Sequence, residues 1–174
     1  RMCLSYQYIS QVHSSTTNRK CSNLRNCNYS TQYVSNADAV SNDPTENRKC
    51  APLATCTPGK YISTPKSTTT NRFCTACDAG KYSSSDNDSV CQACDHANPY
   101  TYQPSQGKSE CLDHEKCNPG HVLVGYSDTT KGACQACSPG TKKSGFGATP
   151  FVQCVNCNPG HRSAAGAASC DRCD

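Results

Sequence analysis

The 174-residue sequence contains no tryptophan, one methionine and three phenylalanines. Leucine, isoleucine, valine and phenylalanine together make up about a tenth of it, whereas a packed core becomes doubtful below about 20%. Burial alone would therefore not offset a backbone entropy of about 1–2 kcal/mol per ordered residue. Long apolar runs are missing too, and a membrane-spanning helix needs about 20 such residues. These shortages argue against a single hydrophobic core and against a membrane span in this segment.

Charge is sparse and unevenly placed. The net charge is +4, from 17 basic and 13 acidic side chains. Residues 1–75 carry nine basic and three acidic side chains, and the remainder carries eight and ten. A mildly basic region can attract an anionic polysaccharide or surface, but solvated surface charge is the simpler interpretation. No nucleic-acid partner is expected.

Cysteine, in contrast, is abundant, with 17 residues. This density is typical of disulfide scaffolds in oxidising compartments, so the chain is expected to be extracellular. A bridge closing a loop of about 15 residues contributes around 3 kcal/mol in the chain-entropy model, so bridges would supply the missing stability. The odd count, cysteines near both ends and the start Arg1-Met2-Cys3 instead of a signal peptide suggest a segment of a longer secreted protein.

The spacing of the cysteines predicts which of them are bonded. After Cys3 they fall in close pairs of the form C-x5-C or C-x2-C, separated by longer stretches. We expect the second cysteine of each pair to bond the first cysteine of the next pair. This pairing closes one loop per repeat and leaves Cys173 unpaired. The predicted bridges are Cys3–Cys21, Cys27–Cys50, Cys56–Cys74, Cys77–Cys91, Cys94–Cys111, Cys117–Cys134, Cys137–Cys154 and Cys157–Cys170.

Two other connectivities stay open, because sequence alone does not decide disulfide pairing. Bonding within each close pair would leave Cys3 over instead and would do little to tie the long loops together. A crossed pattern, first to third and second to fourth, is common in neighbouring types of module.

The loops repeat one phrase, which predicts a linear array of modules. Cys56-Thr57-Pro58-Gly59-Lys60-Tyr61 begins again as Cys77-Asp78-Ala79-Gly80-Lys81-Tyr82. The expected fold class is small and disulfide-rich: an elongated tandem array of short two-stranded β modules, with little helix and no single hydrophobic core. The expected modules 1 to 8 are residues 1–26, 27–55, 56–76, 77–93, 94–116, 117–136, 137–156 and 157–174, the last including the start of a further module.

Two features of the phrase predict local structure. Pro-Gly or Ala-Gly soon after the loop-opening cysteine is typical of a β-turn in which glycine takes a positive φ. A tyrosine follows that cysteine by five or six residues in modules 1 to 5, where a strand is expected to begin and to pair with the strand entering the closing cysteine. The tyrosine ring is expected to pack across the disulfide and to serve as the miniature core of the module. These tyrosines are Tyr8, Tyr33, Tyr61, Tyr82 and Tyr100. Modules 6 to 8 carry Val122, Lys142 and Arg162 there and are expected to be looser or differently packed.

The first three closing cysteines also end a shared phrase, Asn-Arg-x-Cys, at Asn18, Asn47 and Asn71. Together with C-x-P-G-x-Y and C-x-x-C-x-x-G-x-Y, it resembles the cysteine-rich repeats of tumour necrosis factor receptors. The shorter phrase CDAGKYSSSDNDSVCQAC resembles ephrin-receptor-like repeats, and similar tandem repeats occur in extracellular proteins of algae and other single-celled eukaryotes, including surface and flagellar-hair glycoproteins. The resemblance covers Cys3 to Cys173 and implies single-disulfide modules stacked end to end. The six-cysteine unit of true cytokine receptors is not evident.

Metal and redox chemistry are the main alternatives for the cysteines. Cys74-x2-Cys77 and Cys91-x2-Cys94 have a spacing that would suit a four-thiolate zinc site in a cytosolic protein. C-x5-C pairs occupy equivalent places in the repeat, however, so disulfides are favoured. A redox C-x-x-C would need a βαβ context, and the five histidines and scattered acids form no recognisable catalytic set. No catalytic residue, cofactor or metal is expected.

Carbohydrate is the modification that the sequence supports. Asn28-Tyr29-Ser30 and Asn87-Asp88-Ser89 are acceptor sequences for N-linked glycans at Asn28 and Asn87. The stretches 14–17 and 63–70 are candidate O-linked tracts.

The expected function is therefore that of a non-enzymatic extracellular structural rod, a spacer or assembly segment of a larger surface or filament glycoprotein. Its expected partners are other protein chains, including copies of itself. The alternative is the ligand-binding ectodomain of a tumour necrosis factor receptor-like protein, for which Tyr100, Tyr102 and Phe151 would be the candidate anchors.

Overall fold

The computed structural model describes residues 2–95, 100–147 and 153–174. The chain divides into two compact units. One consists of Arg1–Cys56 and Ile62–Cys74, and the other of Thr57–Tyr61 and Thr75–Asp174. The eight module limits expected from the sequence are finer than this division and stay a prediction, but their names are kept below.

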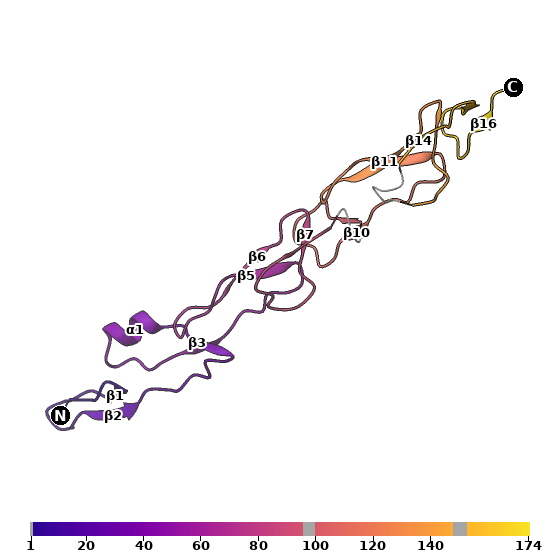
Figure 1. Ribbon diagram of the computed structural model, residues 1–174. Helices are drawn as coiled ribbons and strands as arrows, with labels where there is room; N and C mark the ends of the chain where they lie inside the picture. The colour runs from indigo at the N-terminus through magenta and orange to yellow at the C-terminus, as the bar shows by residue number, and fades with distance from the viewer. Residues whose placement is uncertain (1, 96–99, 148–152) are drawn as a thin grey trace. The chain divides into compact units, whose positions relative to one another are not determined.

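The backbone forms eight separate two-stranded antiparallel sheets, each joining consecutive strands (Figure 1). One sheet lies in each expected module, and this confirms the fold class of tandem two-stranded β modules. The pairs are β1 (Gln7–Gln11) with β2 (Lys20–Asn23), β3 (Gln32–Val34) with β4 (Cys50–Pro52), β5 (Lys60–Thr64) with β6 (Phe73–Ala76), β7 (Lys81–Tyr82) with β8 (Gln92–Ala93), β9 (Thr101–Tyr102) with β10 (Leu112–Asp113), β11 (His121–Tyr126) with β12 (Lys131–Ala136), β13 (Thr141–Lys142) with β14 (Val155–Asn156), and β15 (His161–Arg162) with β16 (Asp171–Arg172).

Helix is as scarce as expected. Among the described residues the one helix is α1 (Ala37–Asn42), in the loop between β3 and β4. Asp38 lies in its first turn, where a negative charge is favourable beside the exposed N–H groups. Its N-cap residue, Asn36, makes no side-chain bond to the helix.

Eight disulfide bonds close the modules. Each joins the cysteine that opens a loop to the cysteine that ends it, across 13 to 23 residues, with Cα atoms 5.4 to 5.9 Å apart. The connectivity is that of the sequential scheme, and neither the within-pair nor the crossed scheme is found. Cys173 remains free and exposed.

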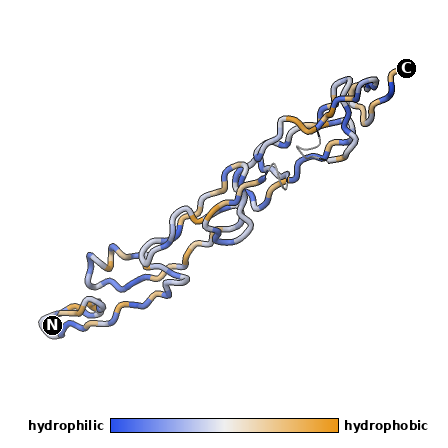
Figure 2. Tube along the Cα trace, in the orientation of Figure 1, coloured by the Kyte–Doolittle hydropathy of each residue, from blue (hydrophilic) through white to orange (hydrophobic). Residues whose placement is uncertain are grey.

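The buried apolar residues are mainly these cysteines. The loop-opening cysteines of modules 2 to 7 are all 7% exposed or less, and besides them the buried apolar side chains in the described residues are Val34, Tyr102 and Leu123. Short hydrophobic and hydrophilic stretches alternate along the whole trace (Figure 2). The sulfur atoms therefore take the place of a hydrophobic core.

The tyrosines do not form the core that the sequence suggested. Tyr8, Tyr33, Tyr61 and Tyr82 lie in the first strand of their modules, as expected, but are only half-buried. The buried residue is instead the next one along: Val34 follows Tyr33, and Ser83, which is fully buried, follows Tyr82. Side chains alternate between the faces of a strand, so the tyrosine and its neighbour point to opposite sides.

Module 5 departs from the pattern in a second way. Its strand β9 begins after Tyr100, which takes a positive φ of 64°. Tyr102 occupies the strand and is 8% exposed. Module 6, which lacks the tyrosine, contains the longest strands, β11 and β12 with six residues each. Modules 7 and 8 also lack the tyrosine and have strands of two residues, as module 4 does with it, so hairpin length does not follow the tyrosine.

The second strands also differ slightly from expectation. In half of the modules the closing cysteine lies within the second strand, as expected; these cysteines are Cys21, Cys50, Cys74 and Cys134. In the other half the second strand begins one residue after the closing cysteine; these strands are β8, β10, β14 and β16.

The Pro-Gly and Ala-Gly turns are confirmed. At all five the residue after the glycine donates its N–H to the carbonyl three residues earlier, as His121 does to Asn118 at 3.1 Å. The glycines have φ between 78° and 86°, which a glycine adopts without steric cost. Gly59 and Gly120 face a loop two modules further on, where an added Cβ would lie 2.2 Å from Gly107 O and 1.9 Å from Gly166 O.

Replacement of Gly120 by alanine should disrupt this packing, and Gly140→Ala is a matched control. Both glycines have φ +80°, but among the described residues nothing lies within 4 Å of a Cβ at Gly140. The free energy of unfolding should fall by about 1–2 kcal/mol in both variants, because alanine disfavours the left-handed backbone conformation. In Gly120→Ala it should fall by a further ~1–3 kcal/mol because the added Cβ overpacks the contact. Hydrogen exchange of the Cys137 amide, which donates to Gly120 O, should accelerate more in Gly120→Ala than exchange of the Cys157 amide does in Gly140→Ala. Equal acceleration would contradict the contact.

Candidate functional site

The joints between neighbouring modules are the arrangement that the structure repeats most closely. In the C-terminal unit the N–H of a loop-opening cysteine donates to the carbonyl of the preceding turn glycine: Cys77 to Gly59 at 2.9 Å, Cys94 to Gly80 at 2.7 Å, and Cys137 to Gly120 and Cys157 to Gly140 at 2.8 Å. Cys173 makes the same bond to Gly160, at 2.8 Å. Its backbone therefore occupies the position of a loop-opening cysteine.

A second set of bonds runs through the residue that follows the tyrosine position. Its carbonyl accepts from the turn glycine of the module before: Ser83 from Gly59 at 2.8 Å, Gln103 from Gly80 at 2.7 Å, Lys143 from Gly120 at 2.7 Å and Ser163 from Gly140 at 3.1 Å. Its N–H donates to the loop of the module after, as Ser83 does to Lys108 at 3.2 Å and Gln103 to Asp128 at 2.7 Å. Lys143 N–H donates likewise to Ala167 O at 3.3 Å, so Ser83, Gln103 and Lys143 each fasten three successive modules through their backbones.

The N-terminal unit contains the same forward bond. Ile9 donates to Pro44 O at 2.6 Å, and Val34 donates to Thr68 O at 2.9 Å. The joint is therefore a property of the repeat rather than of one module.

Side chains at this buried position reinforce the joint when they are polar. Ser83 Oγ donates to Lys60 O at 3.0 Å and Ser163 Oγ donates to Thr141 O at 2.8 Å. Lys143 Nζ donates to the equivalent carbonyl, His121 O, at 2.6 Å, and also to Gly147 O at 3.2 Å and Cys117 O at 3.4 Å. The sequence did not predict a role for these three residues, because the repeated feature that it shows is the tyrosine and not the residue after it.

Lys143 is the least expected of them, since its side chain is 2% exposed and lysines are rarely buried. Three backbone carbonyls, from modules 6 and 7, take the place of water around its ammonium group. Burial lowers the pKa of Lys143 from its ordinary value of 10.5 because it disfavours the charged form.

His114 lies between Cys111 and Cys117, in the C-x5-C link, and connects modules 5 and 6. Its ring is 4% exposed and stacks on Tyr102, with centroids 4.9 Å apart, and it makes a T-shaped contact with Tyr126, with centroids 5.6 Å apart. Nδ1 bonds Lys131 O at 2.9 Å; a carbonyl only accepts, so Nδ1 carries the proton. Tyr102 is therefore occupied inside the fold and is not an exposed anchor, as the receptor hypothesis would require. Phe151 lies outside the described residues.

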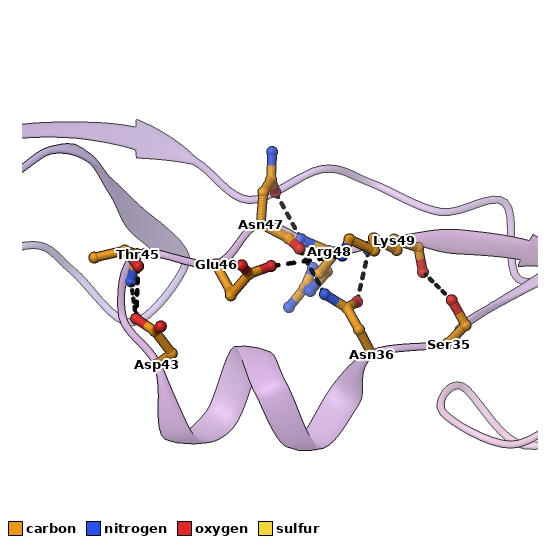
Figure 3. Close-up of polar contacts among 8 residues, drawn as sticks. All are labelled: Ser35, Asn36, Asp43, Thr45, Glu46, Asn47, Arg48 and Lys49. Atoms are coloured by element: carbon orange, nitrogen blue, oxygen red, sulfur yellow. Dashed lines mark hydrogen bonds and ion pairs between the residues drawn. The ribbon is translucent and has the colours of Figure 1, made fainter.

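The Asn-Arg-x-Cys phrase also belongs to a joint. Asn47 Oδ1 accepts from Arg48 N–H at 2.8 Å (Figure 3). It also accepts from Arg25 N–H of module 1, again at 2.8 Å. Asn71 Oδ1 repeats this with Ala54 N–H and Arg72 N–H, both at 2.9 Å. In each case one amide oxygen thus bonds the C-x5-C link of the previous module.

Further side-chain bonds order the loop that carries Asn47 (Figure 3). Asn36 donates to Asn47 O at 2.8 Å and accepts from Lys49 N–H at 2.7 Å. Hydrogen bonds from the Thr45 hydroxyl and then from its N–H hold the pKa of Asp43 below its ordinary value of 3.8.

Both predicted glycan acceptors lie on exposed loops. Asn28 is exposed, and its Oδ1 accepts from Ser30 N–H at 3.2 Å and Ser30 Oγ at 2.5 Å. Asn87 is exposed and has a positive φ of 61°. Glycosylation of either residue stays a prediction.

The cysteines of the alternative zinc site are not available as thiolates. Cys74, Cys77, Cys91 and Cys94 belong to three different disulfides, Cys56–Cys74, Cys77–Cys91 and Cys94–Cys111. Within residues 2–95, 100–147 and 153–174, no cluster of three or more histidine, cysteine or acidic side chains could hold a metal ion. Over the same residues no helix is long and apolar enough to span a membrane.

Comparisons with known proteins do not assign the chain to a type. No protein-family model matches it, and no curated protein is significantly similar to it. Eight single-disulfide loops, each with a pair of short strands, identify the chain as a cysteine-rich repeat array.

Asn47→Ala should loosen the joint between modules 1 and 2. Two backbone N–H groups lose their acceptor, at a cost of about 1–3 kcal/mol for each that stays buried. The amide of Arg25 should then exchange roughly tenfold faster or more, whereas Asn42→Ala, at the exposed end of α1, should leave it unchanged. Unaltered exchange in Asn47→Ala would show that the amide oxygen does not fasten the joint.

Lys143 should titrate below 10.5 in an NMR titration of the lysine side chains. The folded chain holds this proton less tightly than the unfolded chain does, so the charge costs folding free energy below the lowered pKa. That cost disappears as the pH rises through the lowered pKa toward 10.5, and the Lys143 joint should become more stable over that window. Titration at or above 10.5 would contradict the burial of the ammonium group.

Proposed function

We propose that the chain is a non-enzymatic structural spacer of an extracellular glycoprotein, whose modules are stapled internally by disulfides and joined by backbone hydrogen bonds. The recurrence of the same joint supports this most directly. Four loop-opening cysteines donate to the turn glycine before them, over 2.7 to 2.9 Å. A scaffold needs such repeated fastening, whereas a single binding or catalytic site does not.

The bridges support an extracellular location. Eight disulfides persist in oxidising surroundings, chiefly outside the cell. Exposed acceptors at Asn28 and Asn87 suit N-linked glycans on the surface of such a protein. We place the modules with the tumour necrosis factor receptor and ephrin-receptor-like types, on the strength of the sequence phrases given above.

A spacer is favoured over a receptor ectodomain because one of the candidate receptor anchors, Tyr102, is buried inside the fold. A hot spot needs large side chains clustered at a surface, and Tyr102 is stacked against His114.

Single-molecule extension of the chain tests the spacer function. Without reductant, the extension trace should show no step long enough to correspond to the opening of a disulfide-closed loop. With reductant under load, opening of the loops of 13 to 23 residues should give steps of about 4–8 nm, at roughly 3.6 Å per residue.

The matched control is the Cys77→Ser/Cys91→Ser variant, which lacks one bridge and should release that single loop without reductant. Large steps in the unmodified chain without reductant would contradict a spacer held by its bridges.

A further inference from the structure

The N-terminal unit contains a groove between modules 1 and 2, with a volume of about 720 Å³. Apolar residues from both modules line it, including Met2, Leu4, Ile9, Val40 and Pro44. Arg19 and Arg48 lie among them, and the one acidic lining residue, Glu46, is 3.9 Å from Lys49. The groove is therefore apolar with a positive rim.

Exposed apolar side chains are concentrated near the start of this sequence, and two of them, Met2 and Leu4, line the groove. Met2 is 89% exposed, Leu4 54%, Tyr6 57% and Val12 61%. They fall within twelve residues of sequence, whereas elsewhere in the described residues such side chains are scattered. A clustered apolar surface with a polar rim is typical of a binding site.

Charge indicates what the groove binds. Excluding Arg1, the N-terminal unit carries seven basic and three acidic side chains. Modules 4 and 5, residues 77–116, carry the opposite balance, with seven acidic and three basic side chains. Within that stretch Leu112 is 43% exposed and lies next to the exposed Asp113, with the exposed Glu110 nearby in sequence. An aliphatic side chain flanked by carboxylates complements an apolar groove with an arginine rim.

We propose that the groove between modules 1 and 2 of one chain binds the acidic segment 110–113 of a second copy. The two surfaces differ, so the contact is heterologous and can extend copies into an open assembly. This inference rests on the proposed structural function and assigns the surfaces through which the spacer assembles. Exposed charges are screened over about 8 Å at physiological salt, so the contact is salt-sensitive.

Sedimentation velocity of the whole chain tests the proposal, in a Cys173→Ser background that excludes intermolecular disulfides. Oligomers are expected at 50 mM NaCl and monomers at 500 mM. Arg19→Glu/Arg48→Glu should abolish self-association. Arg162→Glu/Arg172→Glu makes the same change of charge at exposed positions in module 8 and should retain it. Mapping of the eight bridges without reduction verifies that each variant is folded.

Complementation identifies the second surface. Glu110→Lys/Asp113→Lys alone should be monomeric, because its segment then repels the basic groove. Mixed with Arg19→Glu/Arg48→Glu, it should form complexes, since one chain retains the native groove and the other the native segment. Restored association requires that these two surfaces meet.

Each other outcome overturns the proposal in a recognisable way. Association that survives both double variants places the interface elsewhere and leaves assembly as a function intact. Monomers under all conditions exclude self-association, while the extension experiment still decides the spacer function. Groove-dependent binding to a sulfated polysaccharide, without self-association, would make an anionic polymer the partner instead.

Discussion

The structure depends on one covalent constraint, the disulfide that closes each loop. Too few large apolar residues are present to build a core, and the loop-opening cysteines of modules 2 to 7 are buried instead. In the chain-entropy model, a bridge around a loop of 14 to 18 residues stabilises folding by about 3 kcal/mol. Strands of only two residues, such as β7 and β8, persist because the bridge beside them holds their ends together.

Because each module is closed by its own bridge, contacts between modules need not supply a core. They are made by backbone groups: a turn glycine, a loop-opening cysteine and the residue after the tyrosine position. The side chain at the last of these positions is then free to vary, and it is Val34, Ser83, Leu123 or Lys143. Lysine is tolerated there because three carbonyls already converge on the site and accept from its ammonium group.

Sequence predicted what local spacing encodes: the array of hairpins, the glycine turns and the bridges between adjacent cysteine pairs. It assigned the miniature core to the tyrosines, because a strand of two or three residues is too short to reveal which of its faces is buried. It misplaced the module 5 strand at Tyr100 because Tyr102 follows only two residues later. The contact of Gly59 with Gly107 spans two modules and leaves no local signal, although the equivalent pair Gly120 and Gly166 repeats it about sixty residues on.

A joint built from backbone atoms separates the fold from the function. Since the fastening groups are mainly backbone atoms, the outward side chains can change without loss of the fold. Residues 1–75 accordingly carry an excess of basic side chains and residues 77–116 an excess of acidic ones, although both regions consist of modules of the same type. Function in such an array lies in these outer surfaces rather than in the repeat. The apolar groove beside Met2 and Leu4 is a place where the sequence departs from what the repeat requires, because no bridge or joint depends on their exposed side chains.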